Sequence, residues 1–274
     1  MLRSSNPILS RQDAFTPGSQ QGYGQPGYGS EPQGYVGGGQ PPLNTEGRMT
    51  FDDVITKSVI TIGLVIAAAA VTMYGLGSGV IPLTAMLPLM IVSGLVGFVT
   101  VLLVSFRRKV SPPLVLAYSV IEGVFVGALS FWFEGLYPGI VIQAVLGTFA
   151  AAGVTLAAYK IFNIRVTPKF QKIVVLATIG FAVALGLNFV LSLFGINLGL
   201  RDGGTGPVSL LAVGVSLLGA VLAVLNLVLD FDHIERGVAM GAPASESWRG
   251  AFGLTVTMVW LYIEILRLLS YLRR

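Results

Sequence analysis

Acidic side chains inside long apolar segments are the residues of this chain with the clearest chemical potential. Glu264 lies in the run Trp260-Leu-Tyr-Ile-Glu-Ile-Leu-Arg267, and Glu122 and Asp230 lie in two other apolar segments. On insertion scales, an acidic side chain at the centre of a bilayer costs about 2.5 to 3.5 kcal/mol, so it normally faces a protein interior or a wet cavity. Such groups mark paths for ions or protons, and this chain is predicted to carry such a site.

The seventh apolar segment has a polar stripe around Glu264. In a helix, this residue shares one face with Thr257, Trp260, Arg267 and Tyr271, so the stripe must face other helices. One interpretation is a structural ion pair between Glu264 and Arg267, which lie one turn apart. The other interpretation, which we favour, makes Glu264 part of a titrating or ion-coordinating site. Arg267 could have extended its side chain to the membrane surface by itself, so it does not explain why an acid lies at mid-span.

The sixth apolar segment carries a second such face, with small residues first and polar residues after them. Its members are Gly219, Ala223, Asn226, Asp230 and His233. An acid at the C-terminus of a helix meets the negative end of the helix dipole, so Asp230 is better explained by a partner. Asp232 and Glu235 are interpreted as solvated. His233 is the single histidine, and it is either a solvated loop residue or a group that tunes a proton site.

Two further acids lie in the third apolar segment. Glu122 is near mid-span and needs water or a hydrogen-bond donor; the candidate donors are Tyr118, Gln143 and Asn188. A structural role and a role in an ion path are both open for it. Glu134 lies at the outer end of the segment, where we interpret it as interfacial, or alternatively as a group that attracts cations to a pore mouth.

The elements that must position these groups are membrane-spanning helices. Of the 274 residues, 54% are hydrophobic and 11% are charged, whereas about a quarter are charged in soluble proteins. No charge occurs from Ser58 to Phe106, which exceeds one span of about 20 residues, and Gly75 to Pro82 supplies a turn there. The seven apolar segments are residues 54–76, 83–106, 114–134, 139–162, 172–195, 207–230 and 250–272. We predict an all-α membrane protein, with a re-entrant last segment as the alternative.

The positions of Lys and Arg predict the orientation, since cations in short loops are retained on the cytoplasmic side. With seven spans, 13 of the 17 Lys and Arg residues lie on the N-terminal side. Arg201, Arg273 and Arg274 lie on the opposite side, and Arg267 lies within the last span. We therefore predict a cytoplasmic N-terminus and interpret the net charge of +4 as a topology signal, with no nucleic-acid partner.

The first 47 residues precede the spans and are rich in Gly, Gln, Pro and Tyr from residue 12 onward. Their low aliphatic content predicts a disordered segment. It is interpreted as a tethered cytoplasmic tail, with weak self-association or partner binding as the alternative. Order is predicted to begin at Thr50, which can cap a helix whose third residue, Asp53, reaches back to it.

Several motifs in this order resemble the Bax inhibitor-1 family, from about Thr50 to the C-terminus. They are Arg107-Arg-Lys109, Ile121-Glu-Gly123, Pro138-Gly-Ile-Val-Ile-Gln-Ala-Val-Leu-Gly-Thr148, Leu229-Asp-Phe-Asp-His-Ile234 and Leu261-Tyr-Ile-Glu-Ile-Leu-Arg-Leu-Leu269. The Gly/Tyr/Gln-rich tail and the Met49-Thr-Phe-Asp-Asp53 start are similar to the bacterial, actinobacterial-type branch. The resemblance implies a multi-pass protein of a bacterial plasma membrane.

The resemblance also implies an architecture and a function. The family's fold is a seven-transmembrane-helix bundle with the C-terminal helix surrounded by the other six. Bacterial members are described as pH-sensitive calcium-leak channels, governed by two aspartates on helices six and seven and an arginine at the end of helix two. By motif position, these roles fall on Asp230, Glu264 and Arg107. Two carboxylates within hydrogen-bond reach would share one proton, Arg107 would compete for the deprotonated form, and proton occupancy would change how the last helix packs.

The same reading assigns roles to neighbouring polar residues. Hard oxygen ligands suit calcium better than softer metals, and no cofactor or tightly bound metal is expected. The expected ion path includes Glu122, Glu134 and Asn226, and the expected modulating residues are Arg267, His233 and Asp232. The chain departs from the family at two positions, since glutamate replaces aspartate at Glu264, and Arg267 stands where relatives often carry asparagine. An ion pair between these two could replace the shared proton.

Other function classes remain beside the channel. The alternative is a non-conducting regulator that binds other membrane proteins, such as a membrane protease, through the bundle surface or the tail. A proton-coupled transporter is a further alternative, because intramembrane acids also serve pumps. An enzyme is disfavoured, because the chain has no cysteine and its one histidine cannot form the His pair of a zinc protease.

Overall fold

The computed structural model describes residues 47–107, 110–196, 198–201 and 208–274, and within these ranges the chain is helical, without strands. Seven of its helices are long and apolar enough to cross a membrane. They are α1 (Phe51–Gly77), α2 (Met86–Phe106), α3 (Pro112–Leu136), α4 (Ile140–Ile161), α5 (Pro168–Leu193), α6 (Leu210–Ala239) and α7 (Glu246–Leu272), with the short 3-10 helix η2 (Leu83–Ala85) before α2. The predicted all-α class with seven spans is confirmed. The predicted tail lies outside the described residues, apart from Gly47.

Several helix boundaries follow from local sequence signals. The Thr50 hydroxyl accepts a hydrogen bond from the Asp53 backbone N–H at 3.2 Å, so the predicted cap of α1 is present. The Asp53 carboxylate pairs with Lys57 at 2.6 Å, one turn further into the helix. Prolines occupy the first turns of α3 and α5, where a missing N–H leaves no helical bond unmade. Gly139, with φ 81°, makes the turn before α4.

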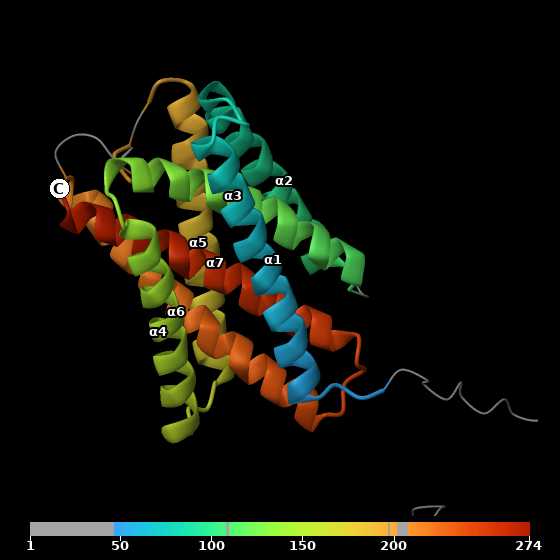
Figure 1. Cartoon of the computed structure of the whole chain (residues 1–274). Helices are drawn as coiled ribbons and strands as arrows, with labels where there is room; N and C mark the ends of the chain where they lie inside the picture. Colours follow the sequence, from blue (N-terminus) through green and yellow to red (C-terminus); the bar gives the residue numbers. More distant parts are fainter. Residues whose placement is uncertain (1–46, 108–109, 197, 202–207) are drawn as a thin grey trace, which may run out of the picture. The chain divides into compact units, whose positions relative to one another are not determined.

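The last helix, α7, is one continuous element of 27 residues, about half of them buried. Figure 1 shows it in red, crossing behind α1 and running beside α6, and it packs along α1, α3, α4 and α6. Helix α5 reaches α7 through the rings of Phe181 and Trp260, whose centroids are 5.9 Å apart. Helix α2 reaches it through a core cluster that contains Val104 and Phe252. The expected arrangement around the C-terminal helix is therefore present, and the re-entrant alternative is wrong.

Helices α1 and α3 form a closely packed pair because glycines on α3 leave room for the α1 backbone. A Cβ atom at Gly123 would lie 2.6 Å from the Val65 carbonyl oxygen, and one at Gly127 would lie 2.5 Å from the Ala69 carbonyl oxygen. Side chains at these two positions would push the helices apart. Small residues allow membrane helices to approach closely at many helix contacts, and they do so here. Helices α1 and α3 therefore form one closely packed unit beside α7.

Buried hydroxyl groups join α7 to α1 and to α3. The Thr61 and Thr255 hydroxyls lie 2.7 Å apart, and so do the hydroxyls of Ser130 and Tyr262. A rotation of α7 would break both contacts, and it would leave the Ser130 and Tyr262 hydroxyls unpaired in apolar surroundings, where no water replaces the lost bond. The hydroxyl pairs thus set which face of α7 is turned toward α6.

Helix α6 is longer than the sequence predicted. It continues to Ala239, nine residues beyond the predicted end, so Asp230 lies inside the helix and His233 lies on a helical turn instead of in a loop. Charged residues interrupt the apolar run at this point, but the helix persists because apolar side chains still find a core. Ile234 packs in a cluster with Met49 and Val54.

Candidate functional site

Glu264 is held by a two-point ion pair beside the interface of α6 and α7. The guanidinium group of Arg201, in the connection between α5 and α6, donates from Nη2 to Oε1 at 2.6 Å and from Nη1 to Oε2 at 2.8 Å. Trp260, one turn earlier on α7, donates its indole N–H to Oε1 at 3.1 Å. The Glu264 side chain is 0% exposed and that of Arg201 is 16% exposed. A guanidinium fork on both carboxylate oxygens is the strong form of a charge-assisted hydrogen bond.

Small and aromatic residues shape the space around this pair. Gly219 of α6 faces the carboxylate, and a Cβ atom there would lie 2.7 Å from the Glu264 carboxyl carbon. The Arg201 guanidinium lies 5.9 Å from the centre of the Phe181 ring, which is tilted against Trp260. The small face predicted for the sixth segment is therefore where the carboxylate fits. The rings limit access of water, which strengthens the attraction between the two charges.

Arg267 does not form the predicted pair with Glu264, although it follows one turn later on α7. Within the described ranges, the carboxylate has its ion pair with Arg201, and the Arg267 Nε atom is buried without a hydrogen-bond partner. The structural ion pair considered within α7 is therefore wrong. Two guanidinium groups accompany one carboxylate in this half of α7.

Asp230 lies on the same interface but in different surroundings. The Thr257 hydroxyl of α7 donates to Asp230 Oδ2 at 2.6 Å. The other oxygen, Oδ1, faces Gly253, where a Cβ atom would lie 3.1 Å away. In the part of the chain that the structure describes, the half-buried Asp230 side chain forms no ion pair with a Lys or Arg. A neutral hydroxyl is therefore its hydrogen-bond partner.

The two carboxylates occupy two levels of one interface. Glu264 and the Asp230 partner Thr257 are seven residues apart on α7, which is about 10 Å at 1.5 Å per residue, and they share one face of the helix. Each acid faces a glycine of the opposite helix, Gly219 for Glu264 and Gly253 for Asp230. The expected hydrogen-bonded pair with a shared proton is not formed in this structure. The interface instead presents two separate acidic positions.

Arg107 lies away from the Glu264 end of the interface. It is the residue that ends α2, its side chain is exposed, and its carbonyl oxygen accepts a hydrogen bond from Arg249 Nη2 at 3.3 Å. Glu264 follows Arg249 by 15 residues, about 22 Å along a helix. Among the described residues, Arg107 forms no ion pair with Asp230 or Glu264. The expected contact is absent because α2 ends where α7 begins.

Two of the expected modulating residues, Asp232 and His233, lie near the C-terminal end of α6, whereas the third, Arg267, lies on α7. Asp232 pairs with Arg236 at 2.8 Å, one turn away, and the His233 side chain is exposed. Glu235 accepts a hydrogen bond from the Tyr159 hydroxyl at 2.7 Å, so this acid joins α6 to α4 instead of being only solvated. This end of the helix is a network of surface ion pairs and hydrogen bonds.

Two of the expected ion-path residues have structural partners. Asn226 donates to the Thr178 hydroxyl at 2.7 Å and thereby joins α6 to α5. The Glu134 carboxylate accepts hydrogen bonds from the backbone N–H groups of Gly139 at 2.6 Å and Val141 at 3.1 Å. It therefore caps the N-terminus of α4, where a negative charge is favourable.

Glu122 of α3 faces α2. Its Oε2 atom lies 2.7 Å from where a Cβ atom of Gly97 would be, so the glycine makes room for the carboxylate. None of the three donors expected for it forms a hydrogen bond with it in the described ranges. The Gln143 Oε1 atom accepts instead from Arg273, and the Tyr118 ring packs edge-on against the Phe252 ring of α7. Across the described ranges, no group of three or more His, Cys, Asp or Glu residues gathers as a metal site would require.

Comparison with known proteins agrees with this architecture. The family described as Bax inhibitor 1 like matches residues 6–274. The chain belongs to this family. The match starts earlier than the motifs from about Thr50 onward, so it includes most of the Gly- and Tyr-rich segment. A comparison with curated proteins gives no match. Membership in the Bax inhibitor-1 family, together with the seven spans, makes the chain a multi-pass membrane protein.

Sequence reasoning missed Arg201, which the structure places on the central acid of this Bax inhibitor 1-like chain. The residue was assigned to a loop on the outer side and given no role. A signal was available, because Arg201 is the lone Lys or Arg between Lys172 and Arg236. A solitary cation next to two long apolar segments is a candidate partner for an acid buried within another.

Proposed function

We propose that this protein is a cation leak channel of a bacterial plasma membrane, with calcium as the ion, a cytoplasmic N-terminus and α7 as the gating element. The observation that carries the proposal is the ion pair between Arg201 and Glu264. A guanidinium group outside the spans holds both oxygens of a fully buried carboxylate on the central helix. That arrangement describes a closed state, in which a tethered cation occupies the place of a mobile one.

The chemistry of the pair supports this mechanism. Carboxylate oxygens are the ligands that Ca²⁺ prefers, and both Glu264 oxygens are engaged while Arg201 is bound. Withdrawal of Arg201 would leave a buried carboxylate with the Trp260 hydrogen bond but without its ion-pair partner, which is costly unless a cation or a proton takes the place of Arg201. Because Arg201 belongs to a connection, its withdrawal requires no helix to unfold. Movement of Arg201, a residue of a connection, thus changes which groups bind the Glu264 carboxylate on α7.

Asp230 supplies a second position for the ion. It lies about 10 Å from the Glu264 level along the same face of α7, and the Thr257 hydroxyl beside it is a further oxygen ligand. A cation released from Glu264 meets the next carboxylate along the α6 and α7 interface. Two moderately spaced sites favour conduction, because the ion binds at each without being trapped.

Protonation of either carboxylate would change the leak. A proton on Glu264 removes the charge that holds Arg201, and the charged groups facing that acid are Arg201 itself and Arg267 of the same helix. A proton on Asp230 removes the second ion position, where the facing groups in the described ranges are the uncharged Thr257 and Gly253. The proposed gating assignment therefore includes both acids. In this proposal Arg107 acts indirectly, by tying the end of α2 to Arg249 at the start of α7.

Calcium uptake by liposomes that contain the purified protein tests this function. We expect pH-dependent uptake by the wild type, and loss of the pH dependence in the double variant Asp230→Asn with Glu264→Gln. Arg201→Gln should raise uptake at neutral pH by at least about fivefold, the lower range of coupling free energies between sites. Arg273→Gln is the matched control, because Arg273 also bonds near the outer helix ends but not to either acid. Unchanged uptake and pH dependence in the double variant would refute the gating assignment.

A further inference from the structure

A long apolar groove separates α1 from α4. Its larger part has a volume of about 620 Å³ and its smaller part about 210 Å³. The two parts share the side chains of Ile62, Ile66 and Phe149, so they form one continuous groove. Helix α7 forms part of the floor throughout, joined by α6 in the larger part and by α3 in the smaller one.

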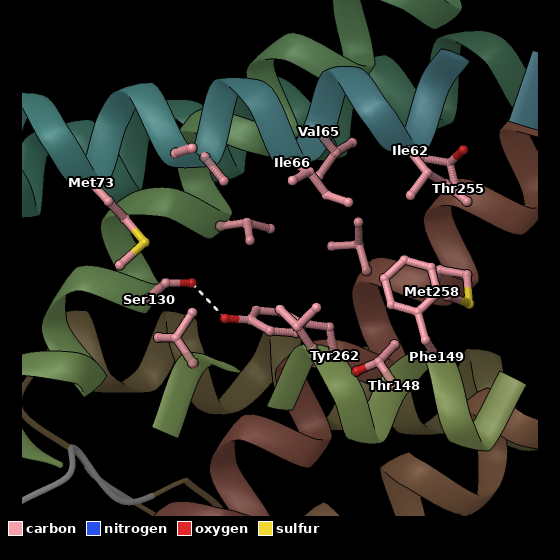
Figure 2. A pocket seen from close by; sticks show the side chains of 16 residues that line it. Ile62, Val65, Ile66, Met73, Ser130, Thr148, Phe149, Thr255, Met258 and Tyr262 are labelled. Carbon is pink, nitrogen blue, oxygen red and sulfur yellow. Dashed lines mark hydrogen bonds between the residues drawn. The ribbon is translucent and has the colours of Figure 1, made fainter. Parts of the chain in front are cut away.

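The groove offers no free polar group along its smaller part. Figure 2 shows Ile62, Ile66 and Met73 of α1 opposite Tyr262 and Met258 of α7. The hydroxyls that line it are engaged within the protein. Ser130 bonds to Tyr262, Thr255 to Thr61, and Thr148 to the Ala144 carbonyl oxygen. An apolar space of this kind stays dry, so hydrocarbon is the chemistry that fits it.

The dimensions favour one hydrocarbon chain over a protein helix. The larger part extends along α1 from Phe51 to Ile66, about 22 Å at 1.5 Å per residue. That is about the depth of one bilayer leaflet including its head groups, half of 40 to 45 Å. All the empty space of this part, out to its open side, is about 1370 Å³, which gives a mean cross-section of about 62 Å², whereas a helix 10 to 12 Å across needs about 80 to 110 Å². A helix could only lie over the groove, while an acyl chain fits within it.

The end of the groove near the start of α1 carries one charge of each sign. Lys160 Nζ lies 3.8 Å from Glu235 Oε1, and the two side chains are 57% and 47% exposed. The ammonium group also lies 5.5 Å from the centre of the Phe51 ring. An ion pair with this much exposure contributes little stability by itself. Tyr159 holds Glu235 Oε2, and the other oxygen, Oε1, and the Lys160 ammonium group are available to a molecule that presents the opposite sign to each.

We propose that this groove binds a membrane phospholipid whose head group carries both a phosphate and a primary ammonium, as in phosphatidylethanolamine. One acyl chain lies along α1 in the larger part of the groove. The phosphate binds Lys160 and the ammonium group binds Glu235. A phospholipid whose phosphate carries an uncharged glycerol in place of the ammonium group, as in phosphatidylglycerol, keeps the first contact and loses the second. The site is separate from the interface of α6 and α7, and the inference does not rest on the channel function.

Native mass spectrometry of the full chain, titrated with dioleoyl phosphatidylethanolamine or dioleoyl phosphatidylglycerol, tests the site. We expect one tightly retained phosphatidylethanolamine, bound up to about fivefold more strongly than phosphatidylglycerol, the range of one exposed charge pair. Glu235→Gln should abolish this preference and leave phosphatidylglycerol binding unchanged. Lys160→Gln should weaken both lipids, and Lys169→Gln, at an exposed lysine at the start of α5, should weaken neither.

A groove-filling variant tests the place of the acyl chain. Gly63 lines the larger part of the groove, and a Cβ atom there meets nothing within 4 Å, so Gly63→Phe adds a ring at a position where a side chain can start without a backbone clash. Gly180 on α5 is equally open, and Gly180→Phe is the matched control. Gly63→Phe should lose the retained lipid and Gly180→Phe should keep it. Equal binding of the two lipids by the wild type, retention in Gly63→Phe, or a dimer that replaces the lipid would overturn the proposal.

Discussion

Asp230 and Glu264 are two acids on one helix interface, and they differ in what holds them. Glu264 is fully buried and has a guanidinium on both oxygens, whereas Asp230 is half-buried and has one hydroxyl as its partner. The same pair of helices and the same arrangement of acid opposite glycine produce both environments. The difference therefore comes from Arg201, which the connection between α5 and α6 brings to one level only. One half of the interface is locked by charge and the other is adjustable.

The largest effect should follow from removing the Arg201 side chain. Arg201→Ala leaves the Glu264 charge buried and uncompensated, which costs about 3 to 5 kcal/mol of stability when one partner of a buried pair is removed. Unfolding of the purified variant in detergent, followed by circular dichroism, measures this loss. Addition of Glu264→Gln to Arg201→Ala should recover part of it, because the buried carboxylate charge is then removed while the buried Arg267 guanidinium remains. A single variant as stable as the wild type would show that the lock contributes nothing.

The two glycines should differ in the cost of an added methyl group. A Cβ atom at Gly219 meets the Glu264 carboxyl group at 2.7 Å and the Phe181 ring at 2.8 Å, while one at Gly253 meets Asp230 at 3.1 Å. Gly219→Ala should therefore lose about 1 to 3 kcal/mol through overpacking. Gly253→Ala should be near neutral, because a small displacement of Asp230 is offset by the about 0.5 to 1 kcal/mol gained in helix propensity. Equal losses in thermal unfolding would remove the distinction between locked and adjustable levels.

The smallest effect should come from the hydroxyl that holds Asp230. Thr257→Val removes the donor at 2.6 Å, and the loss should be about 1.5 kcal/mol, the low end for a hydrogen bond to a charged group, because part of the Asp230 side chain stays exposed. Thr255→Val is the control on the same helix. Its partner Thr61 keeps bonds to the Lys57 and Ser58 carbonyl oxygens, so the loss should be smaller still. A loss in Thr257→Val as large as that in Arg201→Ala would mean that Asp230 is locked as firmly as Glu264.

The sequence was sufficient to predict the membrane-spanning helices and insufficient to predict which charged residues pair. Segment length and apolarity are local properties, so seven helices and the cap at Thr50 could be predicted. The end of α6 could not, because charges at Asp230 and beyond interrupt the pattern although Ile234 still packs in a core. Periodicity located Glu264 on a polar face but could not name its partner. Arg267, the candidate by helical spacing, and Asp230, the candidate implied by the family resemblance, are not bonded to it.

The sequence alone determined that this chain has seven membrane-spanning helices and that acids lie within them. Both can be read from the length of each apolar segment and the position of each charge in it, because a charge in hydrocarbon is costly wherever its partner lies. The tertiary structure decided which charges meet. Arg201 and Glu264 are 63 residues apart and lie on different elements. They meet because hydroxyl pairs set the rotation of α7, Gly219 leaves room for the carboxylate, and the connection before α6 delivers the guanidinium. Those conditions exist only once the helices are packed.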